Sequence, residues 1–145
     1  MSDIFERILL LKKSPMFSEA QTEDLRTVAQ AMEEETFFKG DRIFDINGQG
    51  DNMYIIQHGQ VGISLNKDPS IKGDYIATLS AGDCFGEMNL LDDQPRSASA
   101  HALKDTSTLT LEKERLRGLI INYPELSLSM LRSLSLRIRN ANETH

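Results

Sequence analysis

Short runs of β-branched and aromatic residues alternate with glycine turns through the middle of the chain, and this alternation restricts the possible folds most. The runs have the length of β-strands and lie at residues 36–38, 42–46, 53–57, 60–65, 75–79, 97–103 and 106–111. Turn pairs such as Lys39-Gly40 and His58-Gly59 separate them. Strands spaced about ten residues apart, with glycine between them, are typical of an antiparallel sandwich or a small barrel.

Helical periodicity on either side of this region predicts that helices flank the strands. Apolar residues from Ile4 to Leu11 recur at helical spacing, and Thr22 precedes two acidic residues, as at a helix start. After the strands, the pair Tyr123-Pro124 divides two helical patterns, because proline suits the first turn of a helix. We predict one domain with N-terminal helices over 1–34, strands over 35–111 and C-terminal helices over 112–142.

The distribution of charge and apolar residues argues against several classes of protein. The net charge is −6, although residues 112–145 carry six Lys/Arg and only four Asp/Glu, so the body of the chain is strongly acidic. It therefore lacks the basic face that nucleic-acid binding needs. The single cysteine excludes a disulfide framework within the chain. No apolar run approaches the ~18 residues of a membrane span and no signal peptide is recognisable, so we expect a cytoplasmic protein.

The segment FGEMNLLDDQPRSASA covers residues 85–100, and its middle, GEMNLLDD, lacks the alternation of a strand and predicts a short helix inserted among the strands. A helix that starts near Gly86 points its first free N–H groups toward an anion. Arg96 can add a two-pronged contact to phosphate oxygens. A carboxylate repels phosphate, so Glu87 is expected to bind another group, such as a ribose hydroxyl. Taken alone, Glu87 and Arg96 are equally compatible with a structural ion pair.

This segment resembles the phosphate-binding cassette of cyclic nucleotide-binding domains. The family pattern is roughly F-G-E-[Leu]-[Ala/Ser]-L-L, a few residues, and then P-R-[Ser/Thr/Ala]-A. The chain matches this pattern at Phe85, Gly86, Glu87, Leu90, Leu91, Pro95, Arg96, Ser97 and Ala98. The resemblance extends along nearly the whole chain through SPMFSEAQTEDL, KGDRIFDINGQGDNMYIIQHGQVGIS, AGDCFGE and INYPEL. It implies a mainly β fold with flanking helices, an eight-stranded jelly-roll-like β-barrel that holds cAMP or cGMP.

Carried over residue by residue, the resemblance implies a nucleotide site in and around the cassette, residues 85–98. Glu87 would accept a hydrogen bond from the ribose 2′-hydroxyl, Arg96 would pair with the cyclic phosphate, and Ser97 would contact the phosphate or the purine. Nearby backbone amides would complete the phosphate cradle. The expected ligand-binding residues are Phe85, Gly86, Glu87, Met88, Asn89, Arg96, Ser97 and Ala98, with Ile63 and Ile76 packing on the base and Asn140 and Asn142 reaching it from the last helix.

Two positions depart from the family pattern. Residue 89 is Asn where Ala or Ser is usual, so its larger side chain needs room. Residue 141 is Ala where several bacterial relatives place a threonine that contacts the base, and this departure bears on the choice between cAMP and cGMP. We expect cAMP to be preferred.

Other classes of function are weaker alternatives. Degenerate relatives keep the barrel, bind no nucleotide and serve as protein interaction modules. A metal-dependent barrel enzyme needs clustered histidines, and this chain has no His-x-His pair, no P-loop and no recognisable nucleophile motif. We therefore predict no enzymatic activity, no cofactor and no metal site. A transcription regulator needs a recognition helix, and the helices expected over 112–142 are already assigned to the family's ligand-responsive lid.

The predicted function is that of a regulatory module whose C-terminal helices change position when a cyclic nucleotide binds. An unknown effector protein or a second copy of the chain would read this change. The stripe that contains Leu131, Leu134 and Ile138 is expected to pack in the core and is also a candidate homodimer seam. The Met start favours a free-standing module over a piece of a longer protein.

Overall fold

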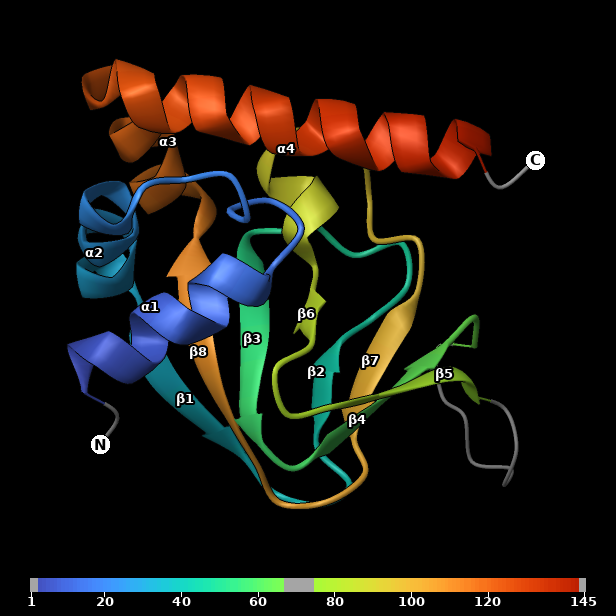
Figure 1. Ribbon diagram of the computed structural model, residues 1–145. Coiled ribbons are helices and arrows are strands. Elements are labelled where there is room, and N and C mark those ends of the chain that lie inside the picture. The colour runs from blue at the N-terminus through green and yellow to red at the C-terminus, as the bar shows by residue number, and fades with distance from the viewer. Residues whose placement is uncertain (1–2, 67–74, 144–145) are drawn as a thin grey trace. The chain divides into compact units, whose positions relative to one another are not determined.

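The computed structural model describes residues 3–66 and 75–143, and the chain forms two compact units (Figure 1). The strand unit is continuous in sequence and runs over Glu33–Lys113. The helical unit combines the two ends of the chain, Met1–Met32 and Glu114–His145.

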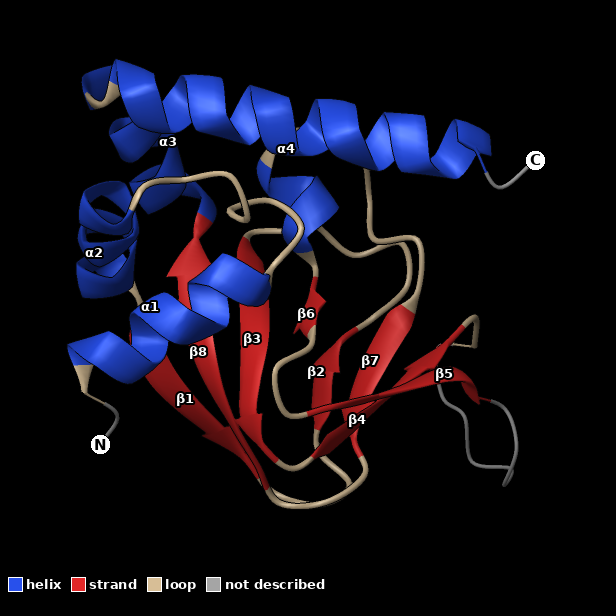
Figure 2. Cartoon of the chain, in the orientation of Figure 1, coloured by secondary structure: helices blue, strands red, loops and turns tan. Residues whose placement is uncertain are grey.

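The described part of the strand unit contains eight strands in two four-stranded antiparallel sheets (Figure 2). The first sheet has the order β1-β8-β3-β6, with bounds Glu33–Phe37, Thr106–Glu112, Asn52–His58 and Cys84–Phe85. The second has the order β2-β7-β4-β5, with bounds Arg42–Phe44, Ser99–Ala102, Gln60–Ser64 and Tyr75–Ser80.

Strand pairing follows a simple rule that links distant parts of the chain. Strand β1 pairs with β8, β2 with β7, β3 with β6, and β4 with β5. Apart from β4 and β5, strands that follow one another in the chain lie in different sheets. This order is typical of a double-sheet jelly roll. The predicted jelly-roll character and flanking helices are thus found, but the expected barrel is not closed. Within the residues described, the strands remain in two separate sheets.

Strands β1 and β6 show best how pairing across the sheet, and not the local sequence, decides the bounds of a strand. Strand β1 begins at Glu33, so three consecutive glutamates are in a strand that the sequence placed at 36–38. All three are exposed, and the backbone pairs with β8 from Glu33 opposite Thr110. Strand β6 has only two residues and pairs Phe85 with Tyr54 of β3. A two-residue strand has no periodicity that a sequence pattern can reveal.

An aromatic core fills the space between the two sheets and supports the site described below. Tyr54 and Phe85 stack with their ring centroids 5.0 Å apart and an interplanar angle of 14°. Phe44 of the other sheet lies 5.9 Å from Phe85 and 6.1 Å from Tyr54. Ile56 and Val61, which are fully buried, belong to the same cluster. Side chains from both sheets therefore bury one continuous apolar layer.

The helical unit contains α1 (Ile4–Lys13), α2 (Thr22–Ala31), α3 (Lys113–Asn122) and α4 (Pro124–Glu143). The first residue of α3, Lys113, still belongs to the strand unit. Asp3 caps α1 by accepting a hydrogen bond from the backbone N–H of Glu6 at 2.8 Å. The Arg7 guanidinium donates to the carbonyl oxygens of Ala29 and Met32 at the end of α2. Pro124 is the first residue of α4, as predicted. No helix found in the described ranges is both long and apolar enough to span a membrane.

Candidate nucleotide site

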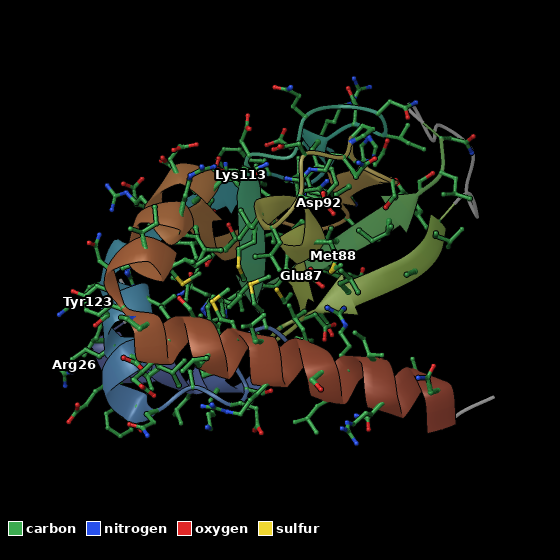
Figure 3. The ribbon with its side chains drawn as sticks, turned by 90° about the horizontal axis from the view of Figure 1, so that it is seen from above. Arg26, Glu87, Met88, Asp92, Lys113 and Tyr123 are labelled. Carbon is green, nitrogen blue, oxygen red and sulfur yellow. The ribbon has the colours of Figure 1, made fainter. Side chains whose placement is uncertain are left out.

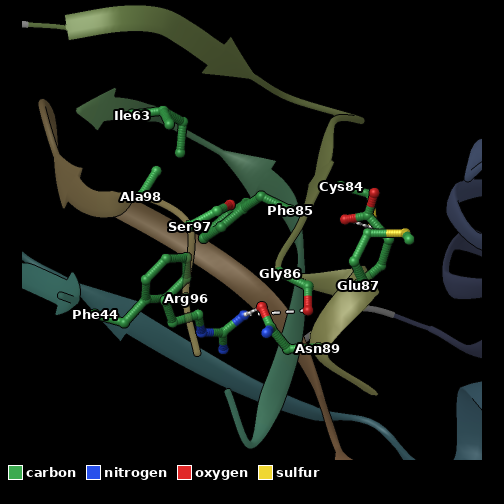
Figure 4. Close-up of a pocket in the computed structure, with 11 residues that line it drawn as sticks. Phe44, Ile63, Cys84, Phe85, Gly86, Glu87, Asn89, Arg96, Ser97 and Ala98 are labelled. Atoms are coloured by element: carbon green, nitrogen blue, oxygen red, sulfur yellow. Dashed lines mark hydrogen bonds between the residues drawn. The ribbon is translucent and has the colours of Figure 1, made fainter. Parts of the chain in front are cut away.

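A pocket of about 270 Å³ opens in the strand unit between the end of β6 and the start of β7 (Figure 4). Nine of the twelve residues predicted from the sequence line it: Ile63, Phe85, Gly86, Glu87, Met88, Asn89, Arg96, Ser97 and Ala98. Phe44 and Cys84 complete the lining. The pocket has roughly the size of a small-molecule site, at the lower end of the usual range.

The predicted inserted helix is a single 3-10 turn, η1, over Glu87–Leu90. Gly86 precedes it with φ 80°, a left-handed conformation that side chains with a Cβ rarely adopt. A Cβ at this position would also lie 2.7 Å from Arg96 Nη1 and 3.0 Å from the carbonyl oxygen of Asn52. Glycine is therefore required here both for the turn and for the close approach of the arginine.

Arg96 is the central cation of the site, and it is 3% exposed. Its Nη1 donates to the carbonyl oxygen of Gly86 and to Asn89 Oδ1, both at 3.1 Å (Figure 4). Its Nη2 donates to the carbonyl oxygen of Asn52 at 2.7 Å. Its Nε is buried and has no hydrogen-bond partner among the described residues. All three bonds thus end on neutral amide oxygens, and among the residues that the structure describes no carboxylate accepts a hydrogen bond from this guanidinium.

Burial lowers the pKa of Arg96, because removing the guanidinium from water disfavours its charged form. Tyr54, Asp51 and Glu87 oppose this shift. Phe44 contributes a further contact, since the guanidinium carbon lies 4.0 Å from the centroid of its ring. The residue remains a cation whose desolvation is only partly compensated by its surroundings.

Both backbone polar groups of Arg96 are also hydrogen-bonded. Its N–H donates to the carbonyl oxygen of Gly48 at 2.7 Å, and its carbonyl oxygen accepts from the N–H of Asn47 at 2.8 Å. These bonds attach the end of the cassette to the turn after β2. The arginine is therefore positioned by a segment far from it in the sequence.

Glu87 lies on η1 at 8% exposure and lines the same pocket. The Cys84 thiol donates to its Oε2 over 3.9 Å. Its charge acts on Arg96 electrostatically, but Arg96 makes its hydrogen bonds elsewhere. The sequence left open a simple ion pair between Glu87 and Arg96. In the structure, hydrogen bonds to neutral oxygens hold the buried Arg96 guanidinium instead.

Residue 89 is Asn where the family pattern has Ala or Ser, and the structure accommodates this larger side chain. Its Oδ1 accepts from Arg96, and its Nδ2 donates to the carbonyl oxygen of Gln94 at 2.7 Å. Gly50 supplies the room, because a Cβ there would overlap Asn89 Cβ and lie 3.1 Å from Arg96 Nε. The larger side chain thus fits because a glycine faces it.

The cassette is also attached to the end of the strand unit. Lys113 Nζ donates to the carbonyl oxygen of Asp92 at 2.7 Å and to Asp93 Oδ1 at 2.8 Å (Figure 3). The backbone N–H of Lys113 donates to the carbonyl oxygen of Asp51 at 2.7 Å. Lys113 therefore contacts the loop after η1 and the residue next to Asn52, whose carbonyl oxygen accepts from Arg96.

Three predicted site residues lie outside this pocket lining. Ile76 is 62% exposed, and it is an extra residue in the β4–β5 pairing, where Ser64 pairs with Tyr75 and Ile63 pairs with Ala77. Asn140 and Asn142 are exposed on α4 in the helical unit. Their contact with a nucleotide base stays a prediction.

Sequence reasoning missed three residues that shape the site: Phe44, Cys84 and Gly50. Cys84 directly precedes the cassette, so its place in the chain was a usable signal. Phe44 and Gly50 reach the site only because β2 and the segment before β3 fold back onto the cassette.

The arrangement can recognise a molecule that carries an anion, a hydroxyl group and an apolar face. Arg96 provides the positive charge for the anion, and Glu87 provides a hydrogen-bond acceptor for a hydroxyl. Ile63, Ala98 and Phe85 provide apolar surface. A sugar phosphate attached to a planar base combines these three features.

Comparison with known proteins assigns this architecture to a family. A family model described as "Cyclic nucleotide-binding domain" matches residues 34–123. A CRP-like cAMP-activated global transcriptional regulator from Mycobacterium tuberculosis is 26% identical over 133 residues, which cover 92% of this chain and 59% of the regulator. A cAMP-dependent protein kinase regulatory subunit from Debaryomyces hansenii is 38% identical over 103 residues, which cover 71% of this chain and 22% of the subunit.

Among solved structures, the N-terminal domain of a transcriptional regulator from Streptomyces coelicolor A3(2) superposes with a TM-score of 0.81 at 27% identity. The match covers 92% of this chain and 95% of that domain. This chain therefore corresponds to a whole domain of that protein, whereas it spans less than two thirds of the curated relatives named above.

Proposed function

The chain belongs to the cyclic nucleotide-binding domain family, and on that premise we propose that it is a non-enzymatic module that binds a purine cyclic monophosphate, cAMP in preference to cGMP. The names of the relatives support cAMP, since one is described as cAMP-activated and another as a subunit of a cAMP-dependent kinase. Cyclic nucleotide is the ligand in this proposal, and no cofactor is required.

The buried Arg96 is the observation that carries this proposal. A guanidinium at 3% exposure has lost most of its hydration, and its hydrogen bonds end on neutral oxygens. An isolated buried charge is costly unless an opposite charge compensates it. A cyclic phosphate carries one negative charge at neutral pH, so its binding beside Arg96 would supply the missing compensation.

The remaining lining residues fit the rest of the nucleotide. Glu87 would accept a hydrogen bond from the ribose 2′-hydroxyl, and backbone N–H groups near Met88 and Asn89 would donate to phosphate oxygens. Ile63 would pack against the base, and Asn140 and Asn142 of α4 would contact it in the ligand-bound state. The packing of Ile76 against the base stays a prediction, since its side chain is exposed and lies outside the pocket lining.

The output of the module would be a change in the position of α3 and α4. A ligand shifts a conformational equilibrium only through its different affinities for the two states. We propose that cyclic nucleotide favours the state in which α4 lies over the pocket. An effector protein or a second copy of the chain would then recognise the rearranged helices.

Isothermal titration calorimetry with cAMP, cGMP and 5′-AMP tests the proposal. We expect saturable binding of cAMP, weaker binding of cGMP and no comparable binding of 5′-AMP, whose doubly charged and open phosphate does not match the site. Circular dichroism checks that the protein is folded. If folded protein binds none of the three at millimolar concentration, the chain is a degenerate member that acts through protein contacts.

A further inference from the structure

The Asn89 side chain is hydrogen-bonded at both ends within the phosphate-binding region. Its carbonyl oxygen accepts from Arg96 Nη1 at 3.1 Å, and its amide nitrogen donates to the carbonyl oxygen of Gln94 at 2.7 Å. It thus connects the pocket's cation to the loop that carries this cation. An amide side chain can accept at one end and donate at the other, whereas an ionised carboxylate can only accept.

Asn89 helps to determine which donors of Arg96 remain for a ligand. A guanidinium has five N–H donors in fixed directions. Both hydrogens of Nη1 are used, by Gly86 and Asn89, and one hydrogen of Nη2 is used by Asn52. The donors left are the Nε–H and the second Nη2 hydrogen. The contact with Asn89, together with those to Gly86 and Asn52, restrains the rotation of the guanidinium.

The neutrality of the Asn89 amide matters as much as its geometry. A carboxylate in the same place would accept the same hydrogen bond but would also cancel the charge of Arg96. The amide holds the cation and leaves its charge available. Gly50 and Gly86 indicate that this close packing is specific, since a Cβ on either residue would lie within 3.1 Å of a guanidinium nitrogen.

We propose that Asn89 is a positioning residue that holds Arg96 in place for the ligand's phosphate while leaving its charge uncompensated. This inference deepens the proposed function and rests on it for the identity of the ligand. It predicts that Asn89 is required in the free protein to restrain the arginine, and in the complex to keep anion affinity high.

Two substitutions at residue 89 separate positioning from simple filling of space. Asn89→Ala removes both hydrogen bonds, so Arg96 gains freedom and cAMP affinity falls by about ten-fold, as for the loss of one hydrogen bond to a charged group. Asn89→Asp keeps the size and the contact with Arg96 but adds a negative charge beside the phosphate. We expect its affinity to fall on the order of a hundred-fold.

The experiment combines titration with a measurement that needs no ligand. cAMP affinities of the wild type, Asn89→Ala, Asn89→Asp and Gln94→Ala are measured by calorimetry. Nitrogen-15 relaxation of the Arg96 Nε–H group reports how rigid the side chain is in each free protein. Gln94→Ala is the matched control, because Asn89 and Asp92 contact only the backbone of Gln94.

The expected order of affinity is wild type and Gln94→Ala, then Asn89→Ala, then Asn89→Asp, with Arg96 more mobile in free Asn89→Ala. If Asn89 only fills space, Asn89→Asp will bind better than Asn89→Ala. If Asn89 competes with phosphate, Asn89→Ala will bind more tightly than the wild type. Either result, or unchanged Arg96 relaxation in Asn89→Ala, overturns the proposal. If the wild type binds no cyclic nucleotide, the proposed function fails, and increased Arg96 mobility in Asn89→Ala still supports the positioning role.

Discussion

At the scale of single residues, Arg96 determines most of the anion recognition that we propose. Arg96→Ala should cost on the order of 2–5 kcal/mol of binding free energy, as when one partner of a buried charge pair is removed. Arg96→Lys should also weaken binding, because an ammonium cannot keep three contacts with amide oxygens and also reach the phosphate.

Calorimetry on the two Arg96 variants and on Glu87→Ala checks this assignment. Glu87→Ala should cost less than Arg96→Ala, since it removes one hydrogen bond to a hydroxyl and leaves the anion's partner in place. An unchanged cAMP affinity in Arg96→Ala would mean that the phosphate lies elsewhere, even if the protein does bind the nucleotide.

Two glycines allow a matched test of packing in the site. Gly50→Ala should destabilise the protein by about 1–3 kcal/mol and weaken cAMP binding, because the new Cβ overlaps Asn89 and approaches Arg96 Nε. Gly118→Ala places the same methyl group in the interior of α3 with no atom within 4 Å. It should stabilise the protein by ~0.5–1 kcal/mol.

Urea unfolding of both glycine variants measures the difference. Equal stability of Gly50→Ala and the wild type would show that the segment before β3 can move away from the cassette at little cost. In that case Gly50 would have no special role in seating Asn89.

At the scale of elements, α4 is the helix proposed to respond to the ligand. If it closes over the pocket, backbone amides of residues 125–142 should exchange with solvent more slowly when cAMP is bound. Hydrogen exchange with and without cAMP, followed by mass spectrometry, tests this. The strands β3 and β8 serve as the internal reference, because their exchange depends on global stability. Identical exchange of α4 in both states would refute the lid.

The exposed apolar stripe of α4 locates the candidate dimer seam more closely than the sequence did. Leu131 and Ile138 are 62% and 63% exposed, whereas Leu134 is partly buried. Leu128 and Ile138 are three residues before and seven residues after Leu131, the spacing of a coiled-coil seam. Leu131 is therefore the residue to substitute in a test of the seam.

Leu131→Arg should convert a dimer to a monomer while cAMP binding is retained. Leu136→Arg is the control, because it adds the same charge at an exposed leucine on a different side of the helix. Sedimentation velocity of the wild type and both variants gives the oligomeric state. A wild type that is already monomeric, with and without cAMP, would remove the seam from the proposal.

At the scale of the whole molecule, the burial of Tyr54 in the aromatic core should make the free energy of unfolding depend on pH in the alkaline range. Burial raises the pKa of the Tyr54 hydroxyl, a hydrogen bond with Asn52 opposes this rise, and Glu35 adds to it. The folded pKa therefore lies above that of the unfolded chain, which is about 10. The resulting stability is fully present below about pH 10 and is lost as the pH rises through the folded pKa.

The free energy of unfolding of the wild type should accordingly fall more steeply above about pH 10 than that of Tyr54→Phe. Urea unfolding between about pH 8 and 11.5 gives both curves. Tyr123→Phe, at an exposed tyrosine, is the control and should follow the wild type. Parallel curves for the wild type and Tyr54→Phe would show that Tyr54 ionises as easily in the folded protein as in the unfolded chain.

Local patterns in the sequence were sufficient to predict the class of fold, the flanking helices, the cassette and the family. These features depend on neighbours only a few residues apart: glycine turns between strand-length runs, Pro124 at a helix start, and the spacing of Gly86, Glu87 and Arg96. The family match over residues 34–123 confirms the resemblance. The ligand contacts themselves are still predictions.

The tertiary structure alone decided which residues surround Arg96 and which strands pair in each sheet. The Nη2 acceptor, the carbonyl oxygen of Asn52, is 44 residues away in the sequence, and Phe44 and Gly50 come from segments that no local rule connects to the cassette. The register of β5 against β4 shifts by one residue at Ile76, and only the pairing of the two strands reveals this shift. Two separate sheets, and not a closed barrel, follow from which strands pair across long loops. Periodicity reports the face that a residue prefers, whereas the partner on that face depends on the folding of the whole chain.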